Sequence, residues 1–324
     1  MSDKNTDIQI GLEGFIEEES TATKKTSRRR GSDHGQAVRN MVIYGKYRQS
    51  NDLIQKSREE LTLLQQNVLT YMMCKINPYY DTSFSYHDLY LKDFCTLHKM
   101  PVNGRSYEYI REAIEGLRKE DTHCYIRQED GGIRAFDWID KAIYYEQEGR
   151  YSIKLDDAMA PYLLQQTEGH FTEMPYVSGL RFAHKHSLKL YRLLCSIHYN
   201  KNIPREATFS IEDLKWRLAV EARYKDFNAF NERVLKPSVK EINAYTEKHI
   251  SYEPIRSGRR VVTHIKFIVA TKETMDLLNA RGKVETELFG LPVSDSVFFG
   301  KESVSVPTDS DEPNTEGQES GTDA

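Results

Sequence analysis

The segment from His184 to Thr271 constrains the fold of this 324-residue chain more than any other part. Within it, the stretch from Tyr224 to Thr246 places apolar residues at three- and four-residue spacings, which predicts a helix with one buried face. These residues are Phe227, Phe230, Val234, Leu235, Val239 and Ile242. The opposite face carries Lys225, Asn228, Arg233, Lys236 and Lys240. Such a face suits a DNA major groove, where Arg pairs with guanine and Asn with adenine, although a solvated helix surface is the plain alternative.

A basic hairpin is predicted directly after this helix. The run Ile250 to Ile255 leads through a short turn into the run Val261 to Val269, in which apolar side chains alternate and form one face for packing. The turn holds Arg256, Arg259 and Arg260. Charges of one sign at a turn repel each other and do not favour folding, but they are well placed to contact phosphates or a minor groove. The segment from His184 also predicts two helices before the helix of residues 224–246. Two helices, a third helix suited to DNA recognition and this hairpin, in that order, predict a winged helix.

The first half of the chain repeats this order. Ser57-Arg-Glu-Glu60 has the form of a capping box and predicts the start of a helix. A second helix is expected from Ser85 and a third after Asn103-Gly104. A hairpin from Thr122 to Ile139 follows, about Asp130-Gly131-Gly132. This hairpin has acidic residues at its tip and would repel phosphates, so the second domain is expected to supply more of the DNA affinity.

A further hairpin, with strands over 142–146 and 150–155, and a short helix over 156–164 are expected to complete the first domain. The predicted fold class is therefore α+β and mainly helical, a tandem of two winged-helix domains with disordered tails. The expected order is a tail over 1–40, a first domain over 41–168, a linker over 169–182, a second domain over 183–283 and an acidic tail over 284–324.

The charge is sorted along the chain, although the whole chain carries a formal net charge of -4. From Ala183 to Lys283 there are 20 Lys and Arg against 11 Asp and Glu, while Val284 to Ala324 holds 10 acidic residues against Lys301 alone. A basic body with an acidic tail fits a DNA-binding domain beside a disordered extension that could compete with DNA. A merely solubilising end is the simpler interpretation of that tail.

Three segments resemble the iteron-binding plasmid replication initiators, a family with two winged-helix domains. They are Ser187-Leu-Lys-Leu-Tyr-Arg-Leu-Leu194, Phe209-Ser-Ile-Glu-Asp-Leu214 and Tyr224-Lys-Asp-Phe-Asn-Ala-Phe-Asn-Glu-Arg-Val-Leu-Lys-Pro-Ser-Val-Lys-Glu-Ile-Asn243. The last segment is the most specific, and Tyr252-Glu-Pro-Ile255 and the Gly-Arg-Arg turn follow it at the expected place. The resemblance extends, less sharply, back to about Met41.

The resemblance implies a mechanism that residue spacing does not show. Monomers would bind double-stranded DNA at the origin repeats, help to open adjacent DNA and recruit host replication proteins such as helicase, a DnaA-type initiator and chaperones. A homodimer in equilibrium with the monomer would bind an operator and repress the protein's own gene. The first domain would add DNA contacts and take part in dimerisation. Arg105 and Arg111, on its third predicted helix, are candidate contacts.

No enzymatic site is expected. In His184-Lys185-His186 the middle residue is Lys, and two histidines two positions apart on a helix diverge, which disfavours the metal site of rolling-circle endonucleases. Gly300-Lys301 continues with Glu302 rather than Ser or Thr, so there is no nucleotide-binding loop. Neither catalytic residues nor a cofactor nor a metal is predicted.

The cellular setting follows from what the sequence contains. No segment has the unbroken apolar length of a membrane span, so the protein is expected in the cytoplasm with no membrane partner. The four cysteines, Cys74, Cys95, Cys124 and Cys195, are dispersed, which favours reduced core thiols.

Two other functions remain open at this point. One is a winged-helix transcriptional regulator with no role at an origin. The residues of the DNA face do not separate it from an initiator, whereas repeats in the DNA beside the gene would. The other is a scaffold whose winged helices bind proteins, which predicts no salt-sensitive affinity for DNA.

Overall fold

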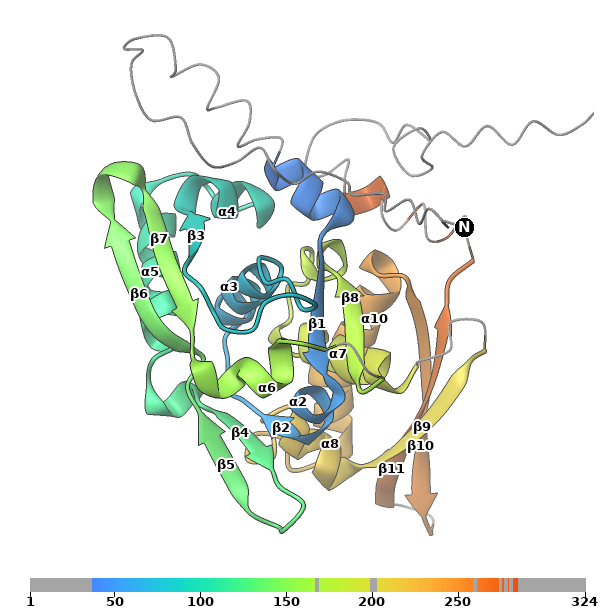
Figure 1. The fold of residues 1–324 in the computed structure, drawn as a ribbon. Helices are drawn as coiled ribbons and strands as arrows, with labels where there is room; N and C mark the ends of the chain where they lie inside the picture. The colour runs from blue at the N-terminus through green and yellow to red at the C-terminus, as the bar shows by residue number, and fades with distance from the viewer. Residues whose placement is uncertain are drawn as a thin grey trace, which may run out of the picture.

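The computed structural model describes residues 37–166, 169–198, 203–258 and 261–273, together with 276, 279 and 282–284. Both predicted tails lie outside these residues, except for their inner ends. Among the described residues, helices and small antiparallel sheets form one continuous hydrophobic core. Figure 1 shows the sheet β3-β7-β6 and the sheet β9 to β11 at opposite sides of the molecule, with α3 and α7 between them.

The first half, residues 37–182, begins with a helix over 37–44. The elements that follow are β1 (Lys46–Ser50), α2 (Asn51–Lys56), β2 (Ser57–Arg58), α3 (Leu63–Met73), β3 (His87–Tyr90), α4 (Leu91–Leu97), α5 (Gly104–Gly116), η1 (Glu120–Thr122), β4 (Cys124–Arg127), β5 (Ile133–Phe136), β6 (Ile139–Tyr145), η2 (Glu146–Glu148), β7 (Arg150–Leu155), η3 (Asp157–Met159), α6 (Ala160–Leu163), β8 (Phe171–Pro175) and η4 (Tyr176–Gly179).

In the second half, residues 183–284, the labelled elements among the described residues are α7 (Lys185–Ile197), β9 (Arg205–Ser210), α8 (Ile211–Arg217), α9 (Phe227–Phe230), the π-helical turn η5 (Asn231–Leu235), α10 (Lys236–Tyr245), β10 (Lys248–Ser257) and β11 (Val261–Thr271). The predicted order of helix, helix, long helix and hairpin is confirmed. In this half, strand β9 was not predicted; it pairs with β11 and makes the hairpin a three-stranded sheet of order β10-β11-β9.

The first half also contains the predicted elements, with two wrong helix starts. Helix α3 begins at Leu63, where Thr62 and Gln65 make the capping box expected of Ser57 and Glu60. Ser57 instead lies in β2, opposite Ile126 of β4. The Ser/Thr-x-x-Glu/Gln pattern occurs twice here, and the copy that directly precedes the apolar run caps the helix.

The second wrong start concerns the helix expected from Ser85. Residues 87–90 form strand β3, which pairs with β7, and helix α4 begins only at Leu91. The third helix is correct: the side chain of Asn103 accepts a hydrogen bond from the Ser106 amide at 2.9 Å and caps α5. The hairpins β4–β5 and β6–β7 are also confirmed.

The stretch expected to link the two domains, residues 169–182, has its own secondary structure and core contacts. Strand β8 pairs with β1 near the start of the first half, and Met174, Tyr176 and Leu180 are buried. The two halves therefore share a core rather than being joined by a solvated connection.

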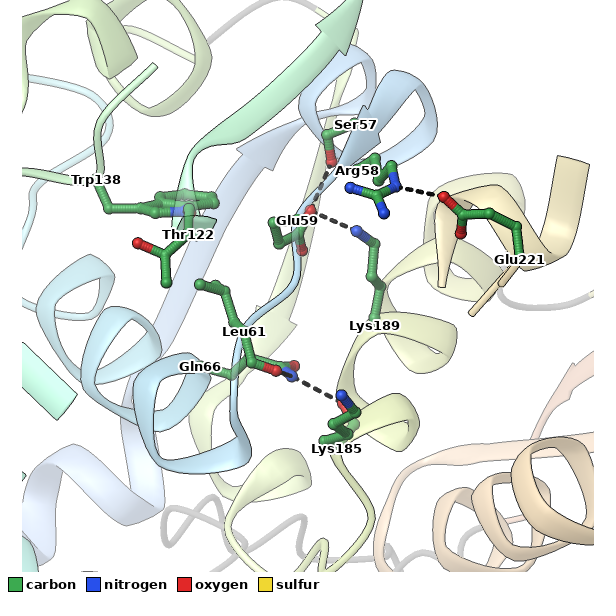
Figure 2. Close-up of polar contacts among 10 residues, drawn as sticks. All are labelled: Ser57, Arg58, Glu59, Leu61, Gln66, Thr122, Trp138, Lys185, Lys189 and Glu221. Atoms are coloured by element: carbon green, nitrogen blue, oxygen red, sulfur yellow. Dashed lines mark hydrogen bonds and ion pairs between the residues drawn. The ribbon is translucent and has the colours of Figure 1, made fainter. Parts of the chain in front are cut away.

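Polar contacts hold the two halves together along helix α7, as Figure 2 shows. Lys189 of α7 forms an ion pair with Glu59, and both side chains are buried. The amide nitrogen of Gln66 donates to the carbonyl of Lys185 at 2.8 Å. Nearby, Arg58 Nε lies 2.9 Å from Glu221 Oε1. Buried charges must be paired to be tolerated, so these contacts fix how the halves pack.

A further contact joins the first hairpin to helix α8. The Arg127 guanidinium lies 3.5 Å from the centroid of the Trp216 ring and also forms a 2.9 Å ion pair with Asp213. A stacked and ion-paired Arg is held in one orientation. The turn end of the β4–β5 hairpin, where Arg127 pairs with Ile133, is thereby attached to the second half.

Two findings bear on the cellular setting. Among the described helices, none combines the length and the apolar character needed to cross a membrane. Cys95, Cys124 and Cys195 are buried and Cys74 is half-buried, and all four are free thiols as predicted. Burial raises the pKa of the Cys95 thiol, so this side chain behaves as a small apolar group.

Candidate nucleic-acid interface

The predicted recognition helix is continuous from Phe227 to Tyr245, but it contains one π-helical turn. Asp226 caps its start by accepting a hydrogen bond from the Ala229 amide at 2.8 Å. The π turn, η5, ends at Leu235, two residues before Pro237 in the first turn of α10. Proline has no amide hydrogen to donate to the carbonyl of Arg233, and its ring would clash with that carbonyl in a regular helix. A local change to wider hydrogen bonding relieves both problems.

The buried and exposed faces of this helix follow the sequence pattern. Phe230, Val234, Leu235 and Ile242 are at most 1 % exposed, Val239 is buried, and Phe227 packs on the core edge. The five candidate DNA-contacting residues are all exposed: Lys225, Asn228, Arg233, Lys236 and Lys240. The structure therefore makes this polar face available to a ligand.

Hydrogen bonds fix the helix to the hairpin beside it. The Tyr252 hydroxyl of β10 donates to Asn231 Oδ1 at 2.5 Å. Asn243 of α10 makes two bonds to Ile250, accepting from its amide at 2.7 Å and donating to its carbonyl at 2.8 Å. Such contacts at both ends hold the helix and the wing in one geometry before any ligand binds, which lowers the ordering cost of binding.

The wing has one apolar and one polar face. Ile265, Phe267 and Val269 of β11 are fully buried against the helices, as the alternation predicts. Strand β10 has a register shift between Ile255 and Arg256, and Arg256 lies exposed near the tip. The other two candidate residues of the turn, Arg259 and Arg260, lie outside the described residues. Of the three wing arginines, the structure thus places Arg256 alone.

The two candidates in the first half occupy different environments. Arg105 is exposed near the start of α5, where its Nε donates to the Tyr109 hydroxyl at 2.8 Å. Arg111 is half-buried, and its guanidinium lies 5.4 Å from the centroid of the Tyr144 ring on β6. Arg105 is available to DNA, whereas Arg111 is engaged in packing α5 on the sheet.

The tip of the first hairpin is acidic, as predicted. The Glu129 side chain is 94 % exposed, and Asp130 accepts a hydrogen bond from the Gly132 amide at 2.8 Å. Gly131 has a φ of +85°, a conformation that residues with a side chain rarely adopt. The tip of the first hairpin is therefore negative, whereas Arg256 near the tip of the second hairpin is positive, as the sequence indicates. Carboxylates repel phosphates and Arg256 attracts them.

Sequence reasoning missed one residue of the exposed helix face. Glu232 is exposed between Asn228 and Lys236, and it forms an ion pair with Lys236 one turn later. The spacing of Glu232 and Lys236 could have indicated this pair, because Glu and Lys four residues apart lie on one side of a helix.

The described residues contain no cluster of three or more His, Cys, Asp or Glu side chains that could hold a metal ion. His184 is the residue before helix α7, and its Nε2 lies 4.0 Å from Glu241. Burial, together with the neighbouring Lys185 and Arg223, lowers the pKa of His186 to about 4. His184 is exposed near Glu241, whereas His186 is half-buried near Lys185 and Arg223.

Sequence comparisons agree with this architecture. The profile described as "Initiator Replication protein, WH1" matches residues 46–195, and the profile described as "Initiator Rep protein, WH2" matches residues 210–269. Together they cover about two thirds of the chain. A curated replication initiation protein of Escherichia coli is 26% identical over 148 residues, which is 45% of this chain and 45% of that protein. The PI protein of Escherichia coli is 24% identical over 191 residues, 55% of this chain and 61% of that protein.

The chain thus aligns with about half the length of these curated relatives. Among solved structures, the Pi initiator protein in complex with iteron DNA has a similar fold, with a TM-score of 0.61 and 20% identity. That match covers 71% of this chain and 99% of the solved one. The two winged-helix profiles, in the order found in the fold, show that this chain belongs to the family of initiator replication proteins.

Proposed function

We propose that this protein is a plasmid replication initiator that binds repeated origin sequences, or iterons, in double-stranded DNA. The observation that carries the proposal is the exposed helix face of Lys225, Asn228, Arg233, Lys236 and Lys240, held rigidly beside a wing with Arg256 at its tip. Family membership and the similar fold of an initiator solved with iteron DNA support it.

The residues divide by the contacts they are suited to make. Arg233 and Asn228 offer the paired donors and acceptors that read base edges in a major groove. Lys225, Lys236 and Lys240 suit phosphates or guanine, and Arg256 and the neighbouring Arg259 and Arg260 suit phosphates beside the wing. Arg105 of α5 is the first domain's candidate contact, and Arg111 contributes chiefly by positioning α5.

The wider role is proposed from the family. Monomers bound to the repeats would help to open adjacent DNA and recruit host helicase, a DnaA-type initiator and chaperones. A dimer formed through the first domain would bind an operator and repress the protein's own gene. Such a protein acts on plasmid DNA in the cytoplasm and needs no catalytic residue or cofactor of its own.

The test is binding of the purified protein to labelled duplexes from the DNA flanking its gene, titrated over salt with random competitor present. We expect selection of a directly repeated segment and a steep loss of affinity as salt rises, because Lys and Arg contacts release counterions from the phosphates. A preference for one inverted repeat at a promoter would instead indicate a transcriptional regulator. No preference at any salt would overturn sequence-specific binding and favour a scaffold.

A further inference from the structure

The exposed face of the recognition helix contains one acidic residue among its cations. Asn228, Glu232, Lys236 and Lys240 follow each other at four-residue spacings, and all four are exposed. The side chains of Glu232 and Lys236 are 58% and 55% exposed and form an ion pair. The carboxylate therefore belongs to the surface that the proposed function places against DNA.

A carboxylate in this position is unfavourable for general DNA affinity. The walls of the major groove are phosphates, and each would repel Glu232. Pairing with Lys236 contributes only about 0.2–0.5 kcal/mol to a helix, and it also occupies a cation that would otherwise attract DNA. Phosphate affinity alone therefore does not account for Glu232, since its small contribution to the helix is offset by repulsion from the phosphates.

The floor of the groove offers this carboxylate a partner. An ionised carboxylate accepts hydrogen bonds but donates none. The groove edge of cytosine presents an N4 amine as its donor, whereas guanine presents two acceptors, N7 and O6. A Lys beside the carboxylate matches those guanine acceptors. The pair Glu232 and Lys236 is thus complementary to the two edges of a C·G base pair, or of two adjacent ones.

We propose that Glu232 is a specificity-determining residue that accepts a hydrogen bond from the N4 amine of a cytosine in the repeated DNA site. Lys236 holds the carboxylate in the free protein and donates to the guanine of the same or the adjacent base pair in the complex. This inference rests on the proposed function, since it needs the helix to lie in a major groove.

The π turn supports this arrangement. η5 spans Asn231 to Leu235 and so includes Glu232, and the Tyr252 hydroxyl holds Asn231 beside it. Glu232 therefore extends from a segment whose backbone is fixed from the wing side. A fixed backbone limits the positions that the carboxylate can reach, which is what base discrimination requires.

The experiment compares the full chain with the variants Glu232→Ala, Glu232→Gln and Glu212→Gln in selection from a duplex library randomised across the repeat. Glu212 is exposed in the first turn of α8, so its variant removes one negative charge from the same winged helix and serves as the matched control. We expect the wild type and Glu212→Gln to select the same C·G pair. Glu232→Ala should lose that preference, and Glu232→Gln should shift it toward adenine, which an amide can pair through N6 and N7.

A modified base then tests whether the N4 amine is the group that Glu232 contacts. The selected cytosine is replaced by 2-pyrimidinone, which lacks the N4 amine, and binding is measured for the wild type and for Glu232→Ala. The wild type should lose roughly 5- to 150-fold in affinity and the variant should lose little, so that the two changes are coupled.

Two results overturn the inference in distinguishable ways. If the wild type selects a sequence but Glu232→Ala selects the same one, with affinity raised for every duplex as in Glu212→Gln, then Glu232 only tunes charge and the proposed function stands. If the wild type selects no sequence, the proposed function fails and this inference fails with it. Equal thermal unfolding of all variants establishes that the comparison concerns folded protein.

Discussion

Lys189 on α7 and Glu59 after β2 form an ion pair that is almost entirely buried between the two halves, with 11% and 7% of their side chains exposed. The Ser57 hydroxyl donates to the same carboxylate at 3.2 Å. Burial lowers the pKa of Lys189, and Glu59 opposes that shift by stabilising the charged ammonium. Each partner makes the other's burial tolerable.

Removal of one partner should therefore cost more than the pair itself contributes. Lys189→Met leaves the Glu59 carboxylate buried without its cation, and we expect the free energy of unfolding to fall by about 3–5 kcal/mol. The double variant Lys189→Met with Glu59→Leu should recover most of this loss, because no unpaired charge remains. Urea unfolding of the three proteins measures both effects. A double variant as unstable as the single one would show that packing, not pairing, decides the cost.

Arg233 and Arg256 are expected to differ in what their loss changes. Arg233→Ala removes a base-reading side chain and should reduce discrimination between cognate and altered sites by about 1–3 kcal/mol. Arg256→Ala removes a phosphate contact from the wing, so it should weaken binding to all sequences alike and reduce the salt slope by about one. Salt titrations with cognate and scrambled duplexes measure both. If Arg256→Ala reduced discrimination and Arg233→Ala weakened all sequences alike, Arg256 would be the base-reading residue and Arg233 the phosphate contact.

Arg105 and Arg111 provide a similar contrast within α5. Arg105 is exposed, so Arg105→Ala should leave stability within about 0.5 kcal/mol of the wild type and weaken DNA binding. Arg111 packs on Tyr144, so Arg111→Ala should lower the free energy of unfolding by roughly 1 kcal/mol through lost packing. Urea unfolding and duplex binding are measured on both variants. Unchanged DNA affinity in Arg105→Ala would remove α5 from the proposed interface.

His186 should make stability depend on pH. Its pKa is lowered from 6.5 to about 4, chiefly by burial and then by Lys185 and Arg223. Between these two values the unfolded chain binds a proton at His186 that the folded chain does not. The contribution of the neutral His186 side chain to the free energy of unfolding is therefore fully present above pH 6.5 and is lost as the pH falls toward about 4. His186→Gln should flatten the slope of unfolding free energy against pH in this window.

The control for that measurement is His249→Gln, at an exposed position on β10. It should keep the wild-type slope. If His186→Gln keeps that slope as well, the ring of His186 is protonated equally in the folded and unfolded chains.

Local sequence patterns predicted the elements that local interactions determine. The spacing of Phe230, Val234 and Ile242 predicted the buried face of the recognition helix, and alternation predicted Ile265 and Phe267 inside the wing. The predicted start of α3 was wrong because two capping patterns, at Ser57 and at Thr62, lie only five residues apart. Thr62 directly precedes the apolar run and caps the helix, and Ser57 pairs with β4 instead.

Features set by distant contacts were not predictable. Strand β9 is half-exposed and short, and it is a strand because it lies beside β11, about sixty residues later. Glu59 and Lys189 are 130 residues apart, so nothing near either residue indicates that they pair. The polar face of the recognition helix was visible in the sequence, but its fixation by Tyr252 and Asn243 depends on the packing of the wing.

Replacement of Pro237 should change stability and DNA recognition in different directions. Pro237→Ala restores an amide donor for the Arg233 carbonyl and allows a regular helix through residues 231–237. The free energy of unfolding should stay level or rise, by up to about 3 kcal/mol, the difference between Pro and Ala inside a helix. Without the π turn, however, Asn228 would rotate about the helix axis relative to Lys236 and Lys240. Affinity for the cognate duplex should therefore fall while affinity for random DNA changes little. Duplex binding and urea unfolding of Pro237→Ala test the role of the π turn. A variant that is no less stable and equally selective would show that the π turn only accommodates the proline. A stable variant with lost selectivity would show that the turn aligns the DNA-reading face of the helix.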